Sequence, residues 1–228
     1  MREELLFVVV PRLAAFCCLS ALAMLYLFRR RAHRWKGSAD DEVDSGDAIS
    51  KCWRYSIGVV LVGHLLAFTF PGAVTLWDRD LLRLIVLEIL GVTAGTLALL
   101  SLLFTAARRL GRGSSFDTVA LTLILLEVVS GLTIAVRYRW ASSWAEVTLT
   151  PYLHSLLGFS PSVVLVSRMP FVVRLHVFSA FAILAIGPLT RIAGSLTVSV
   201  QELAQLASTA VLRLCRPAWR TREQIVRE

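Results

Sequence analysis

Five long stretches of apolar residues dominate the sequence. A helix needs about 20 mostly apolar residues to cross the hydrocarbon core of a bilayer, and the stretches have roughly that length. Of the 228 residues, 56% are hydrophobic and 18% are charged, which excludes an ordinary soluble domain with its charged content of about 25%. The predicted spans run from about Leu5 to Phe28, Tyr55 to Phe70, Leu81 to Ala107, Thr118 to Ala135 and Phe171 to Leu196.

The basic residues divide unequally between the two sides of such a bundle. Sixteen lie in the loop Arg29 to Arg54, the link Arg108 to Arg112 and the tail from Arg191 onward. Cytoplasmic loops are enriched in Lys and Arg, so the N-terminus is expected outside and the C-terminus in the cytoplasm. This topology accounts for the formal net charge of +8, and we expect no nucleic-acid partner. The opposite loops hold Arg79, Arg137, Arg139 and Arg168.

The sequence therefore predicts an all-α integral membrane protein, a bundle of five transmembrane helices. Residues 1–200 form this transmembrane domain. Residues 201–228 form a basic cytoplasmic tail, which an amphipathic helix on the membrane surface would suit. We expect a multi-pass protein of the inner (plasma) membrane, in contact with lipid.

Two histidines lie inside predicted spans, where ionisable residues are costly and usually functional. His64 lies about two turns from the outer end of the second span, and His176 about one to two turns from the same face in the fifth. Two imidazoles at one depth can bind the iron of a b-type haem from both sides. Gly58 and Gly63 beside His64, and Gly187 deeper in the fifth span, would let a macrocycle approach the backbone. In the alternative interpretation each histidine hydrogen-bonds to another helix and binds nothing.

Other polar residues extend this candidate site. Arg174, two residues before His176, would pair with a haem propionate. In the alternative, its side chain extends to the membrane–water interface and binds no cofactor. Glu88 and Glu127 are intramembrane carboxylates that would relay protons or contact a quinone, or are paired with another helix. His154 in the outer loop would contact a quinone or ligate a haem in a partner, or is merely interfacial.

Short motifs in the same order resemble a known family. The segments Val62 to Leu66 and Phe171 to His176 are similar to the haem-ligand segments of the respiratory nitrate reductase gamma subunit. The opening of the first span, Val10 to Ala14, and the run Gly187 to Ile192 resemble the same family. The resemblance covers most of the chain. It implies a quinol-oxidising cytochrome b subunit with five spans and an outside N-terminus.

The resemblance also implies specific ligands. The family binds two stacked haems, and the ligands of the outer haem correspond to His64 and His176. The ligand positions of the inner haem correspond to Arg54 and Gly194, neither of which is an imidazole. We therefore expect one haem b in a cytochrome b domain of residues 1–200. A basic residue of the family close to its quinol site has Arg83 as its nearest match here.

The predicted function is a haem b-containing membrane anchor that passes electrons between the quinone pool and a redox partner subunit. Without an inner haem, most of the membrane separates the haem from the cytoplasm, so an outward-facing partner is expected. The expected partners are an iron–sulfur or cytochrome electron-transfer subunit and a catalytic subunit, which would carry out the substrate chemistry. Two alternatives stay open: a haem-free anchor or assembly subunit, and a two-haem gamma subunit that serves a cytoplasmic nitrate-reductase-like enzyme.

Overall fold

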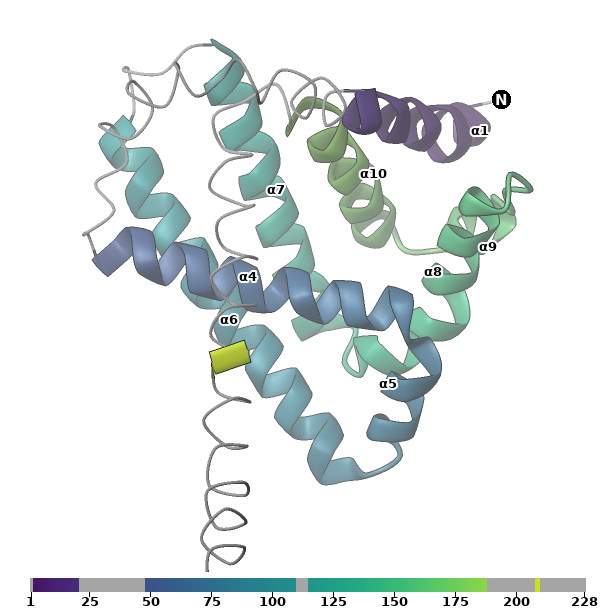
Figure 1. Ribbon diagram of the computed structural model, residues 1–228, viewed down its shortest axis with the longest axis horizontal. Coiled ribbons are helices and arrows are strands. Elements are labelled where there is room, and N and C mark those ends of the chain that lie inside the picture. Colours follow the sequence, from purple (N-terminus) through teal and green to yellow (C-terminus); the bar gives the residue numbers. More distant parts are fainter. Residues whose placement is uncertain (1, 21–47, 110–114, 188–207, 210–228) are drawn as a thin grey trace, which may run out of the picture.

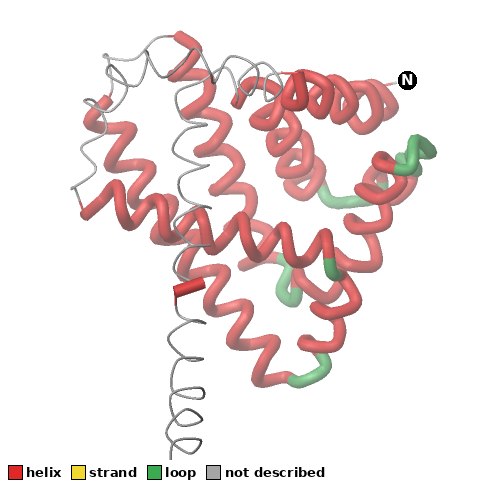
Figure 2. Tube along the Cα trace, viewed as in Figure 1, coloured by secondary structure: helices red, strands yellow, loops and turns green. Residues whose placement is uncertain are grey.

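The computed structural model describes residues 2–20, 48–109, 115–187 and 208–209, and all regular structure within these ranges is helical (Figures 1 and 2). The predicted all-α class is thereby confirmed. The helical residues that follow η1 continue to Ser20. The elements are α1 (Arg2–Glu4), η1 (Leu5–Val9), α4 (Ala48–Thr69), α5 (Pro71–Asp78), α6 (Leu81–Arg109), α7 (Ser115–Arg137), α8 (Ala141–Leu157), α9 (Val164–Ser167) and α10 (Phe171–Ile186).

Three of these helices, α4, α6 and α7, are long and apolar enough to cross a membrane. Two shorter apolar helices, Leu5–Ser20 and Phe171–Ile186, coincide with the beginnings of the first and fifth predicted spans. The predicted continuations to Phe28 and Leu196 lie outside the described residues, as do Gly194 and almost all of the tail 201–228. A multi-pass membrane protein is supported, whereas the count of five spans and the orientation stay predictions.

The connection between α7 and α10 is more regular than the sequence indicated. For the segment between the fourth and fifth predicted spans the sequence predicts only a short interfacial helix around Pro151 to Leu157, whereas α8 begins at Ala141. Pro151 lies inside it. A proline removes one backbone donor and favours a helical φ, so a helix that is packed on neighbours can run through it. Here α8 packs against α5, α9 and the end of α4.

Four apolar helices, α4, α6, α7 and α10, pack in series, each against the next (Figure 1). Membrane helices associate through small residues that let backbones approach closely. At Gly95 of α6 an added Cβ would lie 2.9 Å from Leu132 Cδ2 of α7, so these two helices are in close contact. The small buried residues of α6 and α7 are Ala94, Ala98, Ser101, Ala120 and Ser130.

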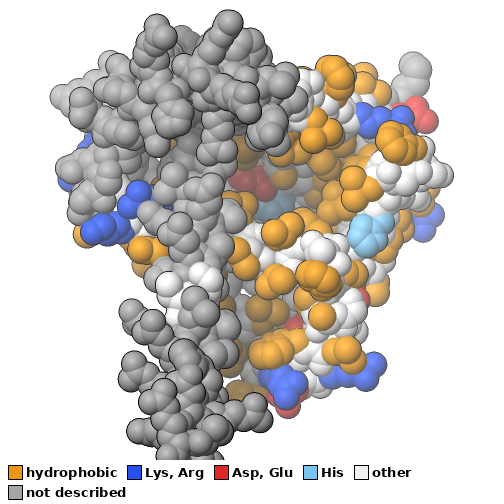
Figure 3. Space-filling view, viewed as in Figure 1, with side chains coloured by type: hydrophobic (Ala, Val, Ile, Leu, Met, Phe, Trp, Pro, Cys, Tyr) orange, Lys and Arg blue, Asp and Glu red, His pale blue; other side chains and the backbone are white. Residues whose placement is uncertain are grey.

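The described surface carries many large apolar side chains (Figure 3). A soluble monomer rarely exposes a contiguous apolar patch larger than a few hundred Å². In a bilayer such side chains face lipid, and the helices satisfy their backbone polar groups internally. The surface therefore agrees with membrane insertion. Examples are Leu65, Leu82, Ile89, Leu100 and Val119.

Pro11 explains how the N-terminal helix is attached to the rest of the protein. Since proline has no N–H, the carbonyl of Phe7, four residues earlier, loses its usual helical donor. The hydroxyl of Tyr152 on α8 donates to this carbonyl at 2.7 Å. Tyr152 is fully buried, and burial raises the pKa of its hydroxyl, which keeps the donor protonated. This hydrogen bond joins the N-terminal helix to α8, which is distant from it in the sequence.

Candidate functional site

The structure brings the two intramembrane histidines together. The ring centroids of His64 and His176 are 6.2 Å apart, and the ring planes are inclined by 46°. His64 lies five residues before α4 ends at Thr69, and His176 lies five residues after α10 begins at Phe171. The first and last helices of the packing series therefore meet through a pair of imidazoles.

The hydrogen bond of His64 determines which ring nitrogen is available. Its Nδ1 lies 2.8 Å from the carbonyl oxygen of Val60, one turn earlier on α4. A carbonyl only accepts, so Nδ1 carries the proton and Nε2 keeps a lone pair. The side chain is exposed, and the ring of Phe68 meets it edge-on at 6.0 Å between centroids. His64 can therefore be reached by a ligand at Nε2.

His176 is held by a different helix, α7. Its Nδ1 lies 3.2 Å from the backbone carbonyl of Glu127, 3.2 Å from Glu127 Oε1 and 3.0 Å from Ser130 Oγ. The hydroxyl of Ser130 donates to the Glu127 carbonyl at 3.0 Å and so presents its lone pairs to the ring. These acceptors place the proton on Nδ1, and Nε2 again keeps a lone pair. Within the described ranges, no side chain or carbonyl is hydrogen-bonded to Nε2 of either ring.

One face of α7 forms the wall behind His176. Glu127, Ser130 and Gly131 are spaced three and four residues apart, which places them on the same helix face. A Cβ at Gly131 would lie 3.1 Å from Cε1 of His176, so glycine allows the ring to rest on the α7 backbone. The buried hydroxyl of Ser179 on α10 donates to Glu127 Oε2. Sequence reasoning missed Ser130, Gly131 and Ser179, although the i, i+3, i+4 spacing was readable.

The centroid separation of the pair matches that expected of two imidazoles that would hold one metal ion. Metal–imidazole bonds of about 2 Å on opposite sides of one ion would separate the ring centroids by about 6 Å. Both Nδ1–H groups are bound to acceptors, which is the arrangement that orients metal-ligating histidines. Among the described residues, no three His, Cys, Asp or Glu side chains gather into a metal site. Two imidazoles alone suit a metal whose remaining ligands come from a macrocycle.

The other residues predicted to lie beside the haem are Arg174, Gly63 and Gly187. Arg174, two residues before His176, forms an ion pair with Glu3, with 3.4 Å between Nη1 and Oε1. Its side chain is one-third exposed. A Cβ at Gly63 or at Gly187 would meet nothing within 4 Å, so both positions leave room beside their helices.

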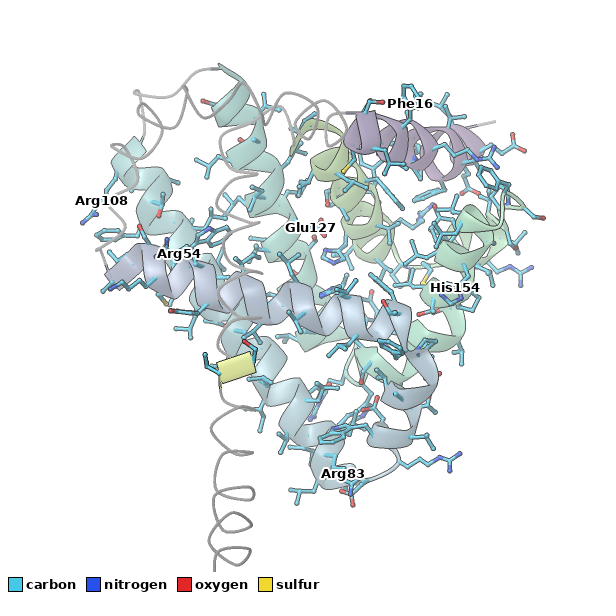
Figure 4. The ribbon with its side chains drawn as sticks, viewed as in Figure 1. Phe16, Arg54, Arg83, Arg108, Glu127 and His154 are labelled. Carbon is cyan, nitrogen blue, oxygen red and sulfur yellow. The ribbon has the colours of Figure 1, made fainter. Side chains whose placement is uncertain are left out.

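The three candidate quinone contacts are separated. Glu127 lies between α7 and α10, whereas Arg83 lies at the beginning of α6, where its guanidinium is 5.3 Å from the Trp77 ring centroid (Figure 4). His154 on α8 has Nε2 3.1 Å from the carbonyl oxygen of Phe68, near the end of α4. Only Glu127 contacts a histidine of the pair directly among these candidates.

Glu88, the second carboxylate in the predicted spans, contacts residues other than the two histidines. Its Oε1 accepts the backbone N–H of Trp140 at 2.6 Å, and its Oε2 lies 3.9 Å from Arg139 Nη2. Trp140 has a left-handed backbone, with φ 64°, and is the N-cap residue that precedes α8. The interpretation of Glu88 as a paired carboxylate therefore agrees with its contacts. Its partners belong to the turn between α7 and α8.

Three helices that are long and apolar enough to cross a membrane indicate a multi-pass membrane protein, and two of its imidazole rings lie 6.2 Å apart between centroids. The sequence profile of the nitrate reductase gamma subunit family matches residues 3–211. The chain belongs to this family. A comparison with curated proteins finds no match. Membership in the family supports a membrane subunit of cytochrome b type in a respiratory oxidoreductase.

Proposed function

We propose that the chain binds one haem b between His64 and His176 and passes electrons between the quinone pool and a redox partner subunit. The separation of 6.2 Å between the centroids of the two rings carries this proposal. Each Nδ1–H is bound to an acceptor, which leaves both Nε2 atoms available as axial ligands. Haem supplies one-electron chemistry when it is bound, and the protein supplies ligands and burial.

Arg174 is the proposed partner of a haem propionate. It lies on the same helix as His176, near its first turn, where it now pairs with Glu3. Ion pairs with a guanidinium are strong when they are partly shielded from water. We infer that a propionate shares or replaces the Glu3 carboxylate. Gly63 leaves space beside α4 for the edge of a macrocycle.

His154 is the most suitably placed of the three quinone candidates. It bonds to the carbonyl of Phe68, and the ring of Phe68 in turn meets the ring of His64. A quinone head group at His154 would thus be one side chain away from the haem ligand. The other two candidates are less suitably placed. Glu127 already contacts His176 and Ser179, and Arg83 lies at the beginning of α6.

The depth of the pair supports an electron partner on the outer face. Both histidines lie five residues from the helix ends that lead to α5 and α9, which is about 7.5 Å along a helix axis. The predicted orientation puts these ends outside. A core about 30 Å thick then leaves most of the membrane between this haem and the cytoplasm. The partners we propose are an electron-transfer subunit, of iron–sulfur or cytochrome type, and a catalytic subunit.

A reduced-minus-oxidised absorption spectrum with a haem-to-protein count tests the cofactor. We expect one b-type haem per chain in the wild type and its loss in both His64→Ala and His176→Ala. His154→Ala is the matched control, because its Nε2 is bonded to Phe68, and it should retain the haem. Two haems per chain would contradict the single-haem proposal. A haem-free preparation would favour an anchor that only docks partners.

Membrane vesicles of opposite orientation test the side of the electron partner. A membrane-impermeant oxidant should reoxidise the reduced haem faster in right-side-out vesicles than in inside-out vesicles, since the haem lies nearer to the outer face. Equal rates, or a faster reaction from the cytoplasmic side, would contradict an outward-facing partner.

A further inference from the structure

The Nδ1 atoms of the two histidines have different hydrogen-bond acceptors. Nδ1 of His64 is hydrogen-bonded to the carbonyl of Val60, a neutral acceptor on its own helix. Nδ1 of His176 has acceptors from α7 that include the carboxylate oxygen Oε1 of Glu127 at 3.2 Å. The carboxyl group that contacts His176 comes from a neighbouring helix, so the asymmetry depends on how α7 packs against α10.

The carboxylate of Glu127 is itself held in place. Its Oε2 accepts a hydrogen bond from the hydroxyl of Ser179, which is fully buried on the same helix as His176. Its Oε1 is thereby directed toward Nδ1. Glu127 and His176 are 21% and 18% exposed, so water competes little with their contact.

We propose that Glu127 is a positioning residue that strengthens His176 as an axial ligand and lowers the reduction potential of the haem, an inference that rests on the proposed haem site. A carboxylate that accepts from Nδ1–H raises the basicity of the ligating nitrogen. A more basic ligand favours ferric over ferrous iron, because the oxidised haem carries one more positive charge. Ser130 acts in the same direction, more weakly, because its oxygen is neutral.

The test is a redox titration of the haem at one pH in the wild type, Glu127→Gln and Ser130→Ala. Glutamine keeps the shape and an acceptor oxygen but removes the carboxylate. We expect Glu127→Gln to retain the haem at the wild-type ratio and to raise its midpoint potential. A change of roughly tenfold in the ferric–ferrous equilibrium corresponds to about 59 mV for one electron. Ser130→Ala should move the potential the same way by a smaller amount.

Glu88→Gln is the matched control. It neutralises the other intramembrane carboxylate, whose contacts are Trp140 and Arg139, and leaves the contacts of His176 intact. Its potential should equal that of the wild type. A purely structural role for Glu127 would reduce the yield of haem-loaded protein without moving the potential.

The outcomes separate this inference from the haem proposal. An unchanged potential in Glu127→Gln, with haem at the wild-type ratio, overturns the role of Glu127 and leaves the haem site standing. If Glu127→Gln fails to load haem, Ser130→Ala decides, and an unchanged potential in that variant overturns the inference. A wild-type protein without haem would contradict the proposed function itself.

Discussion

The imidazole rings of His64 and His176 lie 6.2 Å apart between centroids, and they come from the first and last helices of the series α4, α6, α7 and α10. The two rings differ in their surroundings. His64 is exposed and bonds to its own helix, whereas His176 is bonded to Glu127 and Ser130 of α7. This difference predicts that the two ligand sites respond unequally when a ring is removed.

Free imidazole should restore the haem spectrum more readily in His176→Gly than in His64→Gly. Removal of His176 leaves acceptors on Glu127 and Ser130 that a free imidazole can satisfy, and an unsatisfied buried group costs about 1–3 kcal/mol. Removal of His64 leaves no comparable set of acceptors, because Val60 lies on the same helix.

The measurement for this pair of variants is a titration with imidazole, followed by the low-spin absorbance of the haem. Half-restoration in His176→Gly should need a concentration lower by roughly tenfold, which corresponds to about 1.4 kcal/mol. Equal concentrations for the two variants would mean that the α7 contacts add nothing to ligand binding.

Gly131→Ala should weaken haem binding. An added Cβ would lie 3.1 Å from Cε1 of His176, and the ring cannot move away without stretching its bonds to Ser130 and Glu127. We expect a lower haem-to-protein ratio and a broadened absorption band. Gly91→Ala on α6 is the control, since its Cβ would meet nothing within 4 Å. Equal haem content in the two variants would show that the backbone of α7 can move enough at position 131 to accommodate the added methyl group.

Tyr152→Phe should detach the N-terminal helix from α8. The substitution removes the donor of the 2.7 Å bond to the Phe7 carbonyl, and we expect a loss of about 0.5–1.5 kcal/mol. Thermal unfolding in detergent measures the change, together with limited proteolysis near the N-terminus. Tyr55→Phe, at a 40% exposed tyrosine, should behave as the wild type. A Tyr152→Phe protein of wild-type stability would refute this role of the hydroxyl.

Glu88→Ala should destabilise the turn that joins α7 to α8. Its carboxylate accepts the N–H of Trp140, whose left-handed backbone, with φ 64°, needs external support. We expect a loss of about 1–3 kcal/mol, because a half-buried donor is left unpaired. Glu88→Gln keeps an acceptor and should lose much less. Comparison of the two melting temperatures provides the check, and equal losses would assign the effect to charge rather than to the acceptor.

Local pattern was sufficient for the helices. The helical stretch Leu81–Arg109 matches the predicted third span closely, and the fourth span agrees with α7, because apolar length is a property of consecutive residues. The prediction was poorer for α8, which is longer than the interfacial helix predicted around Pro151 to Leu157 and packs on α5.

The sequence by itself determined that the chain forms apolar membrane helices and that His64 and His176 lie inside two of them, since both follow from residue order and spacing. Only the tertiary structure decided that the two rings lie 6.2 Å apart, that Glu127 and Ser130 contact one of them, and that Tyr152 donates to the carbonyl of Phe7. These contacts depend on how each helix is rotated about its axis and which neighbour it packs against. Rotation and neighbour choice are settled by close packing over whole helices, and no short motif encodes them.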